Sequence, residues 1–340
     1  MKAAYYEGHE TIRVGECEPV LPAAGQVQIR ISHCGICGTD LHIFHGQMDR
    51  RVHMPQVMGH EMSGTIVATG EGVKGYAPGD RVTVRPLDYC GTCPACKAGH
   101  SHICQKLKFI GIDSPGAFQG LWTVPAHTLH RLPDELSFEH GALIEPLAVA
   151  CHDIRRGAVQ GGEYAVVLGG GPIGLLVALV AKAAGARVVV SEINPFRIQL
   201  ARELGLEAVN PVETDLADFV NRATGDAGAD VVFEVTATVA GAEMMTKLPR
   251  TRGRIVVVGI YSAPQKVDLF RCFWRELNLV GARVYEAEDF ERSIELAASG
   301  SLPLDRVITN VLPLEELAAG MRLMERGGDV MKVLVKCSDN

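Results

Sequence analysis

The sequence predicts an α/β protein with two domains: a Rossmann domain with a doubly wound parallel sheet, and a second domain made mostly of β-strands. Short β-rich segments separated by glycine and proline fill the first 120 residues or so, a pattern typical of a compact β domain. From about residue 163, apolar strands alternate with helices, which indicates a parallel sheet covered on both faces. A chain of 340 residues is long enough for both domains.

The individual elements follow in order along the chain. In the first domain, alternation of apolar and polar residues predicts the strands VQIRIS, SGTIVATG and GDRVTV. The second domain starts with the strand EYAVVL and the helix PIGLLVALVAKAAG, which has proline at its start and glycine at its end. The strand ARVVVSE, the helix PFRIQLARELG and the strands ADVVFEVTA, GRIVVVGI and LNLVGARV continue the alternation. Two helical segments, FERSIELAASG and LEELAAGMRLMERG, and the strand VMKVLVK complete the chain.

Composition and charge exclude several classes of partner. The chain is 47% hydrophobic and 21% charged, and its 33 basic and 40 acidic residues give a net charge of -7 without a dense basic block. Nucleic acid and anionic membranes are therefore not expected as partners. The N-terminus lacks the apolar run of a signal peptide, and no uncharged apolar stretch reaches about 18 residues. We expect a cytoplasmic protein whose ten cysteines are reduced, so that clustered cysteines indicate metal binding rather than disulfides.

The segment GGGPIG predicts a dinucleotide site, because it follows a predicted strand, opens a helix, and has Glu192 at the end of the next strand. Its glycines would allow a tight turn, close approach of a pyrophosphate and close helix–strand packing. Glu192 would accept both hydroxyls of the adenine ribose and repel a 2′-phosphate, which favours NAD over NADP, although Arg197 could tolerate that phosphate. The alternative is a flexible turn beside a surface glutamate. The predicted cofactor-binding residues are Gly169, Gly171, Pro172, Ile173, Gly174, Glu192 and Arg197.

Four cysteines in the segment YCGTCPACKAGHSHIC form a C-x2-C-x2-C-x7-C array, namely Cys90, Cys93, Cys96 and Cys104. Four thiolates this close, with glycine and proline to turn the backbone, can complete a tetrahedral zinc site. Such a site leaves no open position for a substrate, so it would be structural. An iron–sulfur cluster and four unliganded thiols are the alternatives.

A second metal site is indicated around Cys37. His60 and Glu61 follow it in GHEMSGTIVATGEGV, and Asp80 follows in APGDRV. One cysteine, one histidine and a carboxylate from separate segments suit a catalytic zinc with a free position, although a lone buried histidine can also be a core residue. Glu145 lies in an apolar run before Pro146, where a carboxylate needs a partner; a metal role and a helix N-cap role are both open.

Together these motifs resemble the zinc-containing medium-chain dehydrogenases/reductases of the alcohol dehydrogenase superfamily. CGICGTDLH, GHEMSGTIVATGEGV, the four-cysteine lobe and GGGPIG occur in that family's order over nearly the whole chain. The pair GHE and IEPLAV is similar to the polyol (sorbitol-type) dehydrogenases and their sugar-acid relatives, whereas threonine dehydrogenases tend to have Asp-Pro in place of Glu145-Pro146. The resemblance implies a GroES-like catalytic domain over residues 1–146 with a zinc lobe at about 88–106, an NAD-binding Rossmann domain over 147–284, and a return to the catalytic domain over 285–340.

The resemblance also implies roles for individual residues. Cys37 and His60 would bind the catalytic zinc, and Glu61 and Glu145 occupy the acidic positions, of which one binds directly; Cys34 matches no ligand. Thr39 would take the proton of an alcohol whose pKa the zinc lowers, and would pass it through the nicotinamide ribose to His42. A helix-cap role for Thr39 and a plain surface position for His42 are the alternatives. The chain departs from the common GAFAEY pattern at residues 116–121.

The expected function is zinc-dependent hydride transfer between NAD and a secondary alcohol, namely a polyol, sugar alcohol or sugar acid that is oxidised to the ketone. An L-threonine 3-dehydrogenase and a 2,3-butanediol-type dehydrogenase use the same chemistry and remain alternatives. A dinucleotide-binding protein without turnover is the alternative from another class. The resemblance further implies a homo-oligomer, with a tetramer favoured over a dimer.

Overall fold

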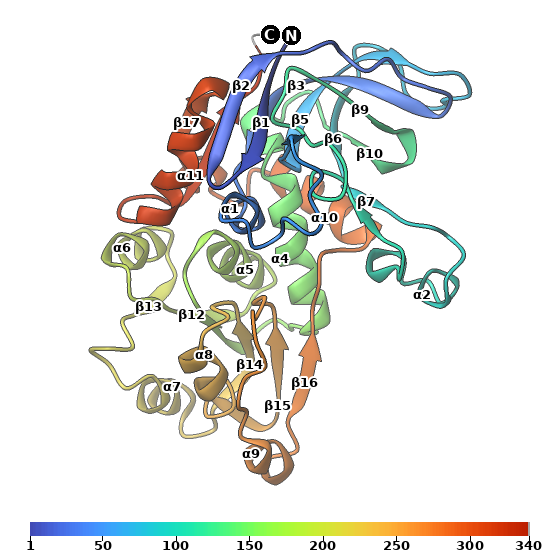
Figure 1. Ribbon diagram of the computed structural model, residues 1–340. Helices are drawn as coiled ribbons and strands as arrows, with labels where there is room; N and C mark the ends of the chain where they lie inside the picture. Colours follow the sequence, from blue (N-terminus) through green and yellow to red (C-terminus); the bar gives the residue numbers. More distant parts are fainter. Residues whose placement is uncertain (339–340) are drawn as a thin grey trace. The chain divides into compact units, whose positions relative to one another are not determined.

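The computed structural model describes residues 1–338, which form two compact units (Figure 1). Unit 1 contains Met1–Glu145, Glu286–Gly300 and the chain from Leu304 onward. Unit 2 contains Pro146–Tyr285 and Ser301–Pro303. Among the described residues, no helix is long and apolar enough to cross a membrane.

Unit 1 is built around a seven-stranded sheet with two smaller sheets beside it. The large sheet has the order β10 (Leu129–Arg131), β6 (Arg81–Val84), β5 (Glu61–Thr69), β3 (Gln26–Gly35), β18 (Lys332–Lys336) and β17 (Ile308–Pro313), and β9 (Leu121–Pro125) also pairs with β3. The smaller sheets are β2 (Thr11–Glu16), β1 (Lys2–Gly8) and β4 (Gln56–Val57), and β7 (Leu87–Asp88) with β8 (Lys108–Phe109).

The helices of unit 1 are short apart from two near the end of the chain. They are α1 (Gly38–Phe44), α2 (Pro94–Lys97), α3 (Phe138–Gly141), α10 (Ala287–Ala298) and α11 (Leu317–Arg326), with 3-10 turns η1 (Ser101–Ile103), η2 (Ala126–Thr128), η3 (Leu304–Arg306) and η4 (Leu314–Glu316). Helix α4 (Ile144–Arg156) begins in unit 1 and continues into unit 2. Helix α10 starts earlier than the segment FERSIELAASG suggested, because Glu286 and Asp289 form a capping box ahead of it.

Strand β3 organises the centre of unit 1. Eight of the ten residues in QVQIRISHCG are buried, since β3 has strands on both sides and contributes to the core. At its carboxyl end Gly35 pairs with Glu61 of β5 on one side and with Leu334 of β18 on the other. This register brings the start of β5 and the C-terminal strand to the same place.

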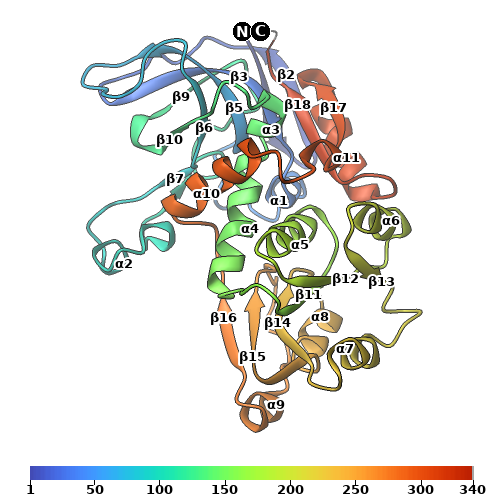
Figure 2. The same cartoon turned by 180° about the vertical axis from the view of Figure 1, so that it is seen from behind.

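Unit 2 is a six-stranded parallel sheet with helices, which confirms the predicted Rossmann fold. Its order is β13 (Glu207–Val209), β12 (Arg187–Ser191), β11 (Tyr164–Leu168), β14 (Ala229–Glu234), β15 (Pro249–Val257) and β16 (Asn278–Gly281). The helices are α5 (Pro172–Ala183), α6 (Pro195–Glu203), α7 (Leu216–Thr224), α8 (Val239–Met244) and α9 (Leu269–Trp274). Both views show β14, β15 and β16 side by side (Figures 1 and 2).

The direction of the strand order in unit 2 reverses between β11 and β14, which are adjacent although β12 and β13 intervene in the sequence. Apolar residues of these strands form the core, including the fully buried Val166, Val189, Val232 and Ile255. In open α/β sheets, ligands bind outside the carboxyl ends of the strands at such a reversal. The glycine turn after β11 therefore starts at the expected place for a cofactor.

Candidate functional site

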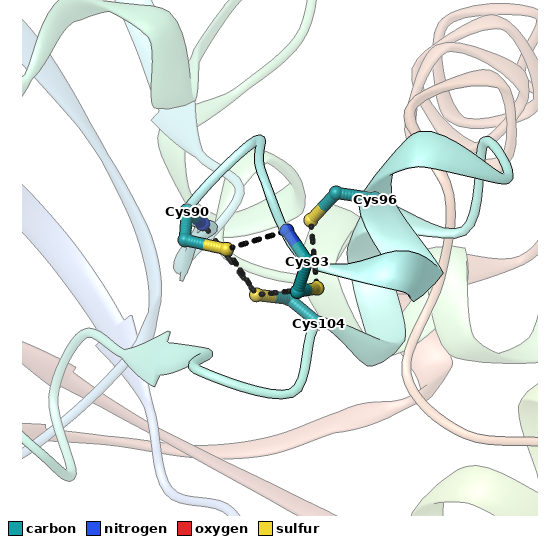
Figure 3. Close-up of side chains that lie close together, drawn as sticks. All are labelled: Cys90, Cys93, Cys96 and Cys104. Carbon is teal, nitrogen blue, oxygen red and sulfur yellow. Dashed lines mark hydrogen bonds between the residues drawn. The ribbon is translucent and has the colours of Figure 1, made fainter.

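The four cysteines of the lobe converge on one point (Figure 3). The Sγ–Sγ distances are 3.5 Å for Cys93–Cys96, 3.7 Å for Cys93–Cys104 and 3.5 Å for Cys90–Cys104. A tetrahedron of thiolates around zinc, with Zn–S bonds of about 2.3 Å, has edges of about 3.8 Å. The spacing of the sulfurs therefore fits a zinc ion with only a small expansion.

Hydrogen bonds within the lobe stabilise negative charge on the Cys90 sulfur. Hydrogen bonds from Thr92 and from the Cys93 N–H lower the pKa of Cys90 to about 5. Burial and hydrogen bonds to the neighbouring cysteines raise the pKa of Cys96 to about 12. A dication would stabilise all four sulfurs as thiolates, so the lobe is suited to hold Zn²⁺.

Cys104→Ser should remove one zinc ion per chain and lower the melting temperature by several degrees, because structural zinc contributes directly to folding. Elemental analysis and a thermal scan measure the two effects. The matched control is Cys272→Ser in unit 2, which lies outside the lobe. Unchanged zinc content and stability in Cys104→Ser would contradict a structural zinc site.

The second candidate metal site brings Cys37, His60 and Glu61 together. One potential ligand atom from each lies within 4.8 Å of the others. Cys37 ends the loop after β3 as the N-cap of α1, and His60 directly precedes Glu61, the first residue of β5. Because Gly35 pairs with Glu61, the register between β3 and β5 places the three side chains side by side.

Two residues that the sequence interpretation did not select complete this cluster. Asp40 is fully buried, accepts a hydrogen bond from the Cys37 N–H at 2.9 Å, and lies 3.8 Å from His60 Nδ1. Metal-binding histidines commonly have such a carboxylate behind them. Lys332 of β18 is buried, forms an ion pair with Glu61 Oε2, and donates to the Ile36 carbonyl at 2.8 Å.

Small residues make room for these contacts. A Cβ on Gly35 would lie 2.2 Å from Glu61 Oε2 and 3.0 Å from Lys332 Cε. A Cβ on Gly59, which has φ +95°, would lie 2.9 Å from Cys34 Sγ. Cys34 is itself fully buried and does not belong to the metal-ligand group.

The electrostatics of the cluster suit a cation. Burial alone would lower the pKa of His60, but the charges of Asp40, Cys37 and Glu145 raise it to about 10. Burial likewise opposes the charge of Lys332, yet Glu61, Cys37 and Glu145 raise its pKa. Within residues 1–338, Glu61 Oε1 and His60 Nδ1 have no hydrogen-bond partner. A buried carboxylate oxygen without a donor, among negative charges that raise the pKa values of His60 and Lys332, fits a bound zinc ion.

Glu145 lies in the first turn of α4 and is 4% exposed. Since α4 begins at Ile144, Glu145 is inside the helix and the N-cap alternative is wrong. Its carboxylate is stabilised by the positive end of the helix, and its charge acts on His60 and Lys332. Asp80 takes no part in the cluster, because it pairs with Arg131 at 2.6 Å and accepts from the Ala77 N–H.

Thr39 and His42 lie on α1, directly after Cys37. The N-cap of α1 is Cys37, so the cap alternative for Thr39 is wrong. His42 is exposed in unit 1, and its Nδ1 donates to Gln47 Oε1 at 2.6 Å. Residues three apart on a helix face the same side, so Thr39 and His42 are neighbours along one face of α1.

The glycine turn in unit 2 has the geometry of a phosphate-binding turn. Gly169 has φ +99°, and a Cβ on Gly174 would lie 1.9 Å from the Gly169 carbonyl oxygen. Gly171 is the N-cap of α5, with Pro172 at its first position and Ile173 next. The free N–H groups at this helix end favour a pyrophosphate.

Glu192 and Arg197 border this turn. The Glu192 carboxylate accepts from the N–H groups of Gly170, Ile193 and Asn194 at 2.7–2.9 Å. Arg197 Nη1 lies 4.0 Å from Glu192 Oε2 and 3.6 Å from where a Cβ on Gly171 would be. A carboxylate and a guanidinium group thus lie next to each other where the adenine ribose of a dinucleotide would bind.

Comparisons with known proteins agree with this geometry. Residues 23–134 match the alcohol dehydrogenase GroES-like domain, and residues 172–299 match the zinc-binding dehydrogenase family. The 2-dehydro-3-deoxy-L-galactonate 5-dehydrogenase of Pseudoalteromonas atlantica is 53% identical over 99% of both chains. The sorbitol dehydrogenase of Halalkalibacterium halodurans is 32% identical over 98% of this chain and 99% of its own.

A solved zinc-binding dehydrogenase from Sinorhizobium meliloti with bound NADP has the same fold, with a TM-score of 0.93, 31% identity and 98% coverage of each chain. The chain is therefore an oxidoreductase that acts on an alcohol and uses zinc and a nicotinamide cofactor. It belongs to the zinc-containing medium-chain dehydrogenases/reductases.

Proposed function

We propose that this chain oxidises a secondary hydroxyl of a sugar acid, specifically C5 of a 2-dehydro-3-deoxyaldonate, to the ketone with NAD⁺ as hydride acceptor. The cluster of Cys37, His60 and Glu61 is the observation that carries the chemistry. The substrate class is supported by the relative at 53% identity, whose name describes this reaction.

We assign zinc binding to Cys37, His60 and Glu61, with Glu145 outside the direct ligands, because only the first three have converging ligand atoms. A zinc ion there would supply a Lewis acid that lowers the pKa of the substrate hydroxyl, and NAD⁺ would supply the hydride acceptor. Asp40 orients the His60 ring, and Lys332 holds one oxygen of Glu61.

We assign the removal of the substrate's hydroxyl proton to residues of α1. Thr39 is half-buried in the first turn of α1, two residues after Cys37, so we assign its hydroxyl to take the substrate proton. Gln47 holds Nδ1 of His42, which leaves Nε2 free to release a proton to solvent. Imidazole is the side chain suited to this exchange near neutral pH.

The proposed function is tested by measuring NAD⁺ reduction with 2-dehydro-3-deoxy-L-galactonate, sorbitol, L-threonine and (R,R)-2,3-butanediol. We expect the sugar acid to have the highest kcat/KM, by at least about tenfold, which is ~1.4 kcal/mol of transition-state binding. If sorbitol instead has the highest kcat/KM, the protein would be a polyol dehydrogenase. Higher kcat/KM for threonine or butanediol would overturn the sugar-acid assignment.

NAD rather than NADP is our proposed cofactor, and Glu192 is the supporting residue. Glu192→Gln keeps an acceptor for the backbone N–H groups but removes the charge that repels a 2′-phosphate. The ratio of kcat/KM for NAD⁺ over NADP⁺ should fall by about tenfold or more. Arg197→Gln is the matched control and should move that ratio in the opposite direction, and a wild-type preference for NADP⁺ would refute the assignment.

We also propose a cytoplasmic homo-oligomer, with a tetramer favoured over a dimer. None of the ten cysteines, which all lie within residues 1–338, forms a disulfide, as expected in a reducing compartment. On unit 2, α9 exposes Leu269, Phe270, Phe273 and Trp274 by 67–76%, more apolar surface than a monomer usually leaves in one place. Light scattering of the purified protein distinguishes a tetramer from a dimer or a monomer.

A further inference from the structure

Glu234 is a buried acid in unit 2 that the proposed chemistry does not use. It is the last residue of β14 and is fully buried. Its Oε1 accepts from the Thr236 N–H at 2.9 Å, from the Thr236 hydroxyl, and from the Ala237 N–H at 3.2 Å. Within residues 1–338 no salt bridge involves Glu234, so its carboxylate is satisfied by the loop that directly follows it.

Two glycines form a socket around this carboxylate. A Cβ on Gly241 of α8 would lie 2.4 Å from Glu234 Oε1, and a Cβ on Gly259, after β15, would lie 2.9 Å from Glu234 Oε2. Separate segments of the chain therefore leave space for this one side chain. Burial and the adjacent Glu234 also raise the pKa of Tyr261.

The loop held by Glu234, residues 235–238, lies against the glycine turn. The Val235 N–H donates to the Leu168 carbonyl at 3.0 Å, and a Cβ on Gly169 would lie 2.9 Å from Thr236 Cγ2. The loop thus follows β14, on one side of the reversal in strand order, while Glu192 follows β12 on the other. Since Glu192 lies where the adenine ribose binds, the loop borders the half of the crevice left for the nicotinamide.

The backbone of this loop needs such support. Ala237 has φ +54°, a left-handed conformation that is strained for a residue with a Cβ. Its N–H is held by both Glu234 oxygens, at 3.2 and 3.3 Å. Without these acceptors the loop would lose the interactions that keep Ala237 in this conformation.

We propose that Glu234 is a positioning residue: it fixes the conformation of loop 235–238, and this loop contacts the nicotinamide half of the cofactor. The inference deepens the proposed function and rests on its nicotinamide cofactor, but on neither the substrate nor the zinc. The two halves of the cofactor then depend on different parts of unit 2. The adenosine diphosphate half contacts the glycine turn and Glu192, and the nicotinamide half requires the loop.

The test compares the dissociation constants of NADH and of ADP-ribose, which lacks the nicotinamide, by fluorescence titration and calorimetry. Glu234→Ala should weaken NADH binding by about tenfold, which corresponds to ~1.4 kcal/mol. Binding of ADP-ribose should change by less than about twofold. Glu234→Gln, which keeps one acceptor oxygen, should recover part of the loss of NADH affinity.

Asp230→Asn is the matched control. Asp230 lies near the opposite end of the same strand, accepts from the Tyr164 N–H at 2.8 Å and pairs with Arg250, so it tests the loss of a hydrogen-bonded carboxylate away from the loop. Both ligands should bind to this variant as they do to the unaltered protein. If Glu234→Ala does not fold, Thr236→Val removes the hydroxyl that bonds to Glu234 and to Thr238 within the loop, keeps the Thr236 N–H bond to Glu234, and should weaken NADH binding selectively, to a smaller extent.

Equal weakening of NADH and ADP-ribose in the Glu234 variants, or no weakening of either, would overturn the proposal. The first result would give Glu234 a general structural role, and the second would leave the loop independent of it. Because the titrations contain no substrate, an incorrect substrate assignment would not alter the result.

Discussion

Cys37→Ala should lower the rate of NAD⁺ reduction by about a thousandfold or more and reduce the zinc content from the two ions per chain that we propose to one. The reason is that a Lewis acid contributes several kcal/mol of transition-state stabilisation, and ~4 kcal/mol corresponds to about three orders of magnitude. The ion in the four-cysteine lobe should remain, since the lobe uses none of the same ligands. Steady-state kinetics and elemental analysis measure both effects on one preparation.

Cys34→Ala is the control for this experiment, because Cys34 is a nearby buried cysteine that lies outside the ligand group. Its loss should leave a cavity and cost roughly 1–3 kcal/mol of stability, with both zinc ions and most of the rate retained. A Cys37→Ala enzyme with near-normal turnover would disprove the catalytic zinc site.

Lys332→Met should destabilise the metal-free protein by about 3–5 kcal/mol, because removal of one partner leaves Glu61 as a buried, uncompensated charge. Zinc bound beside Glu61 would replace part of the lost positive charge, so the destabilisation should be smaller in the zinc-loaded protein. Denaturant unfolding of both forms gives the two free energies.

Lys336→Met is the matched variant, since Lys336 lies on the same strand but is exposed. We expect it to change the free energy of unfolding by less than about 1 kcal/mol, with or without zinc. Equal effects of the two lysine substitutions would show that the ion pair with Glu61 does not stabilise the protein.

Much of the fold follows from short-range patterns. The strand–glycine turn–helix order around Gly169 depends on residues close in sequence, and it predicted the Rossmann unit correctly. The four lobe cysteines lie within one loop, so their spacing was enough to anticipate their convergence. The cap alternatives for Thr39 and Glu145 failed because helix starts are uncertain by a residue or two: α1 uses Cys37 as its cap and α4 starts at Ile144.

The sequence by itself determined the fold class, the family resemblance and the residue types suited to zinc and to a dinucleotide, because these depend on local spacing and periodicity. Tertiary structure alone decided which groups surround them. Lys332 reaches the cluster because β18 pairs with β3. Its hydrogen bond to the Ile36 carbonyl joins two residues that are 296 positions apart in the sequence. Asp40 turns toward His60, and Glu234 fills a socket between two distant glycines. Periodicity along the chain indicates strands and their buried faces, but it does not indicate which strands pair or which buried polar groups meet.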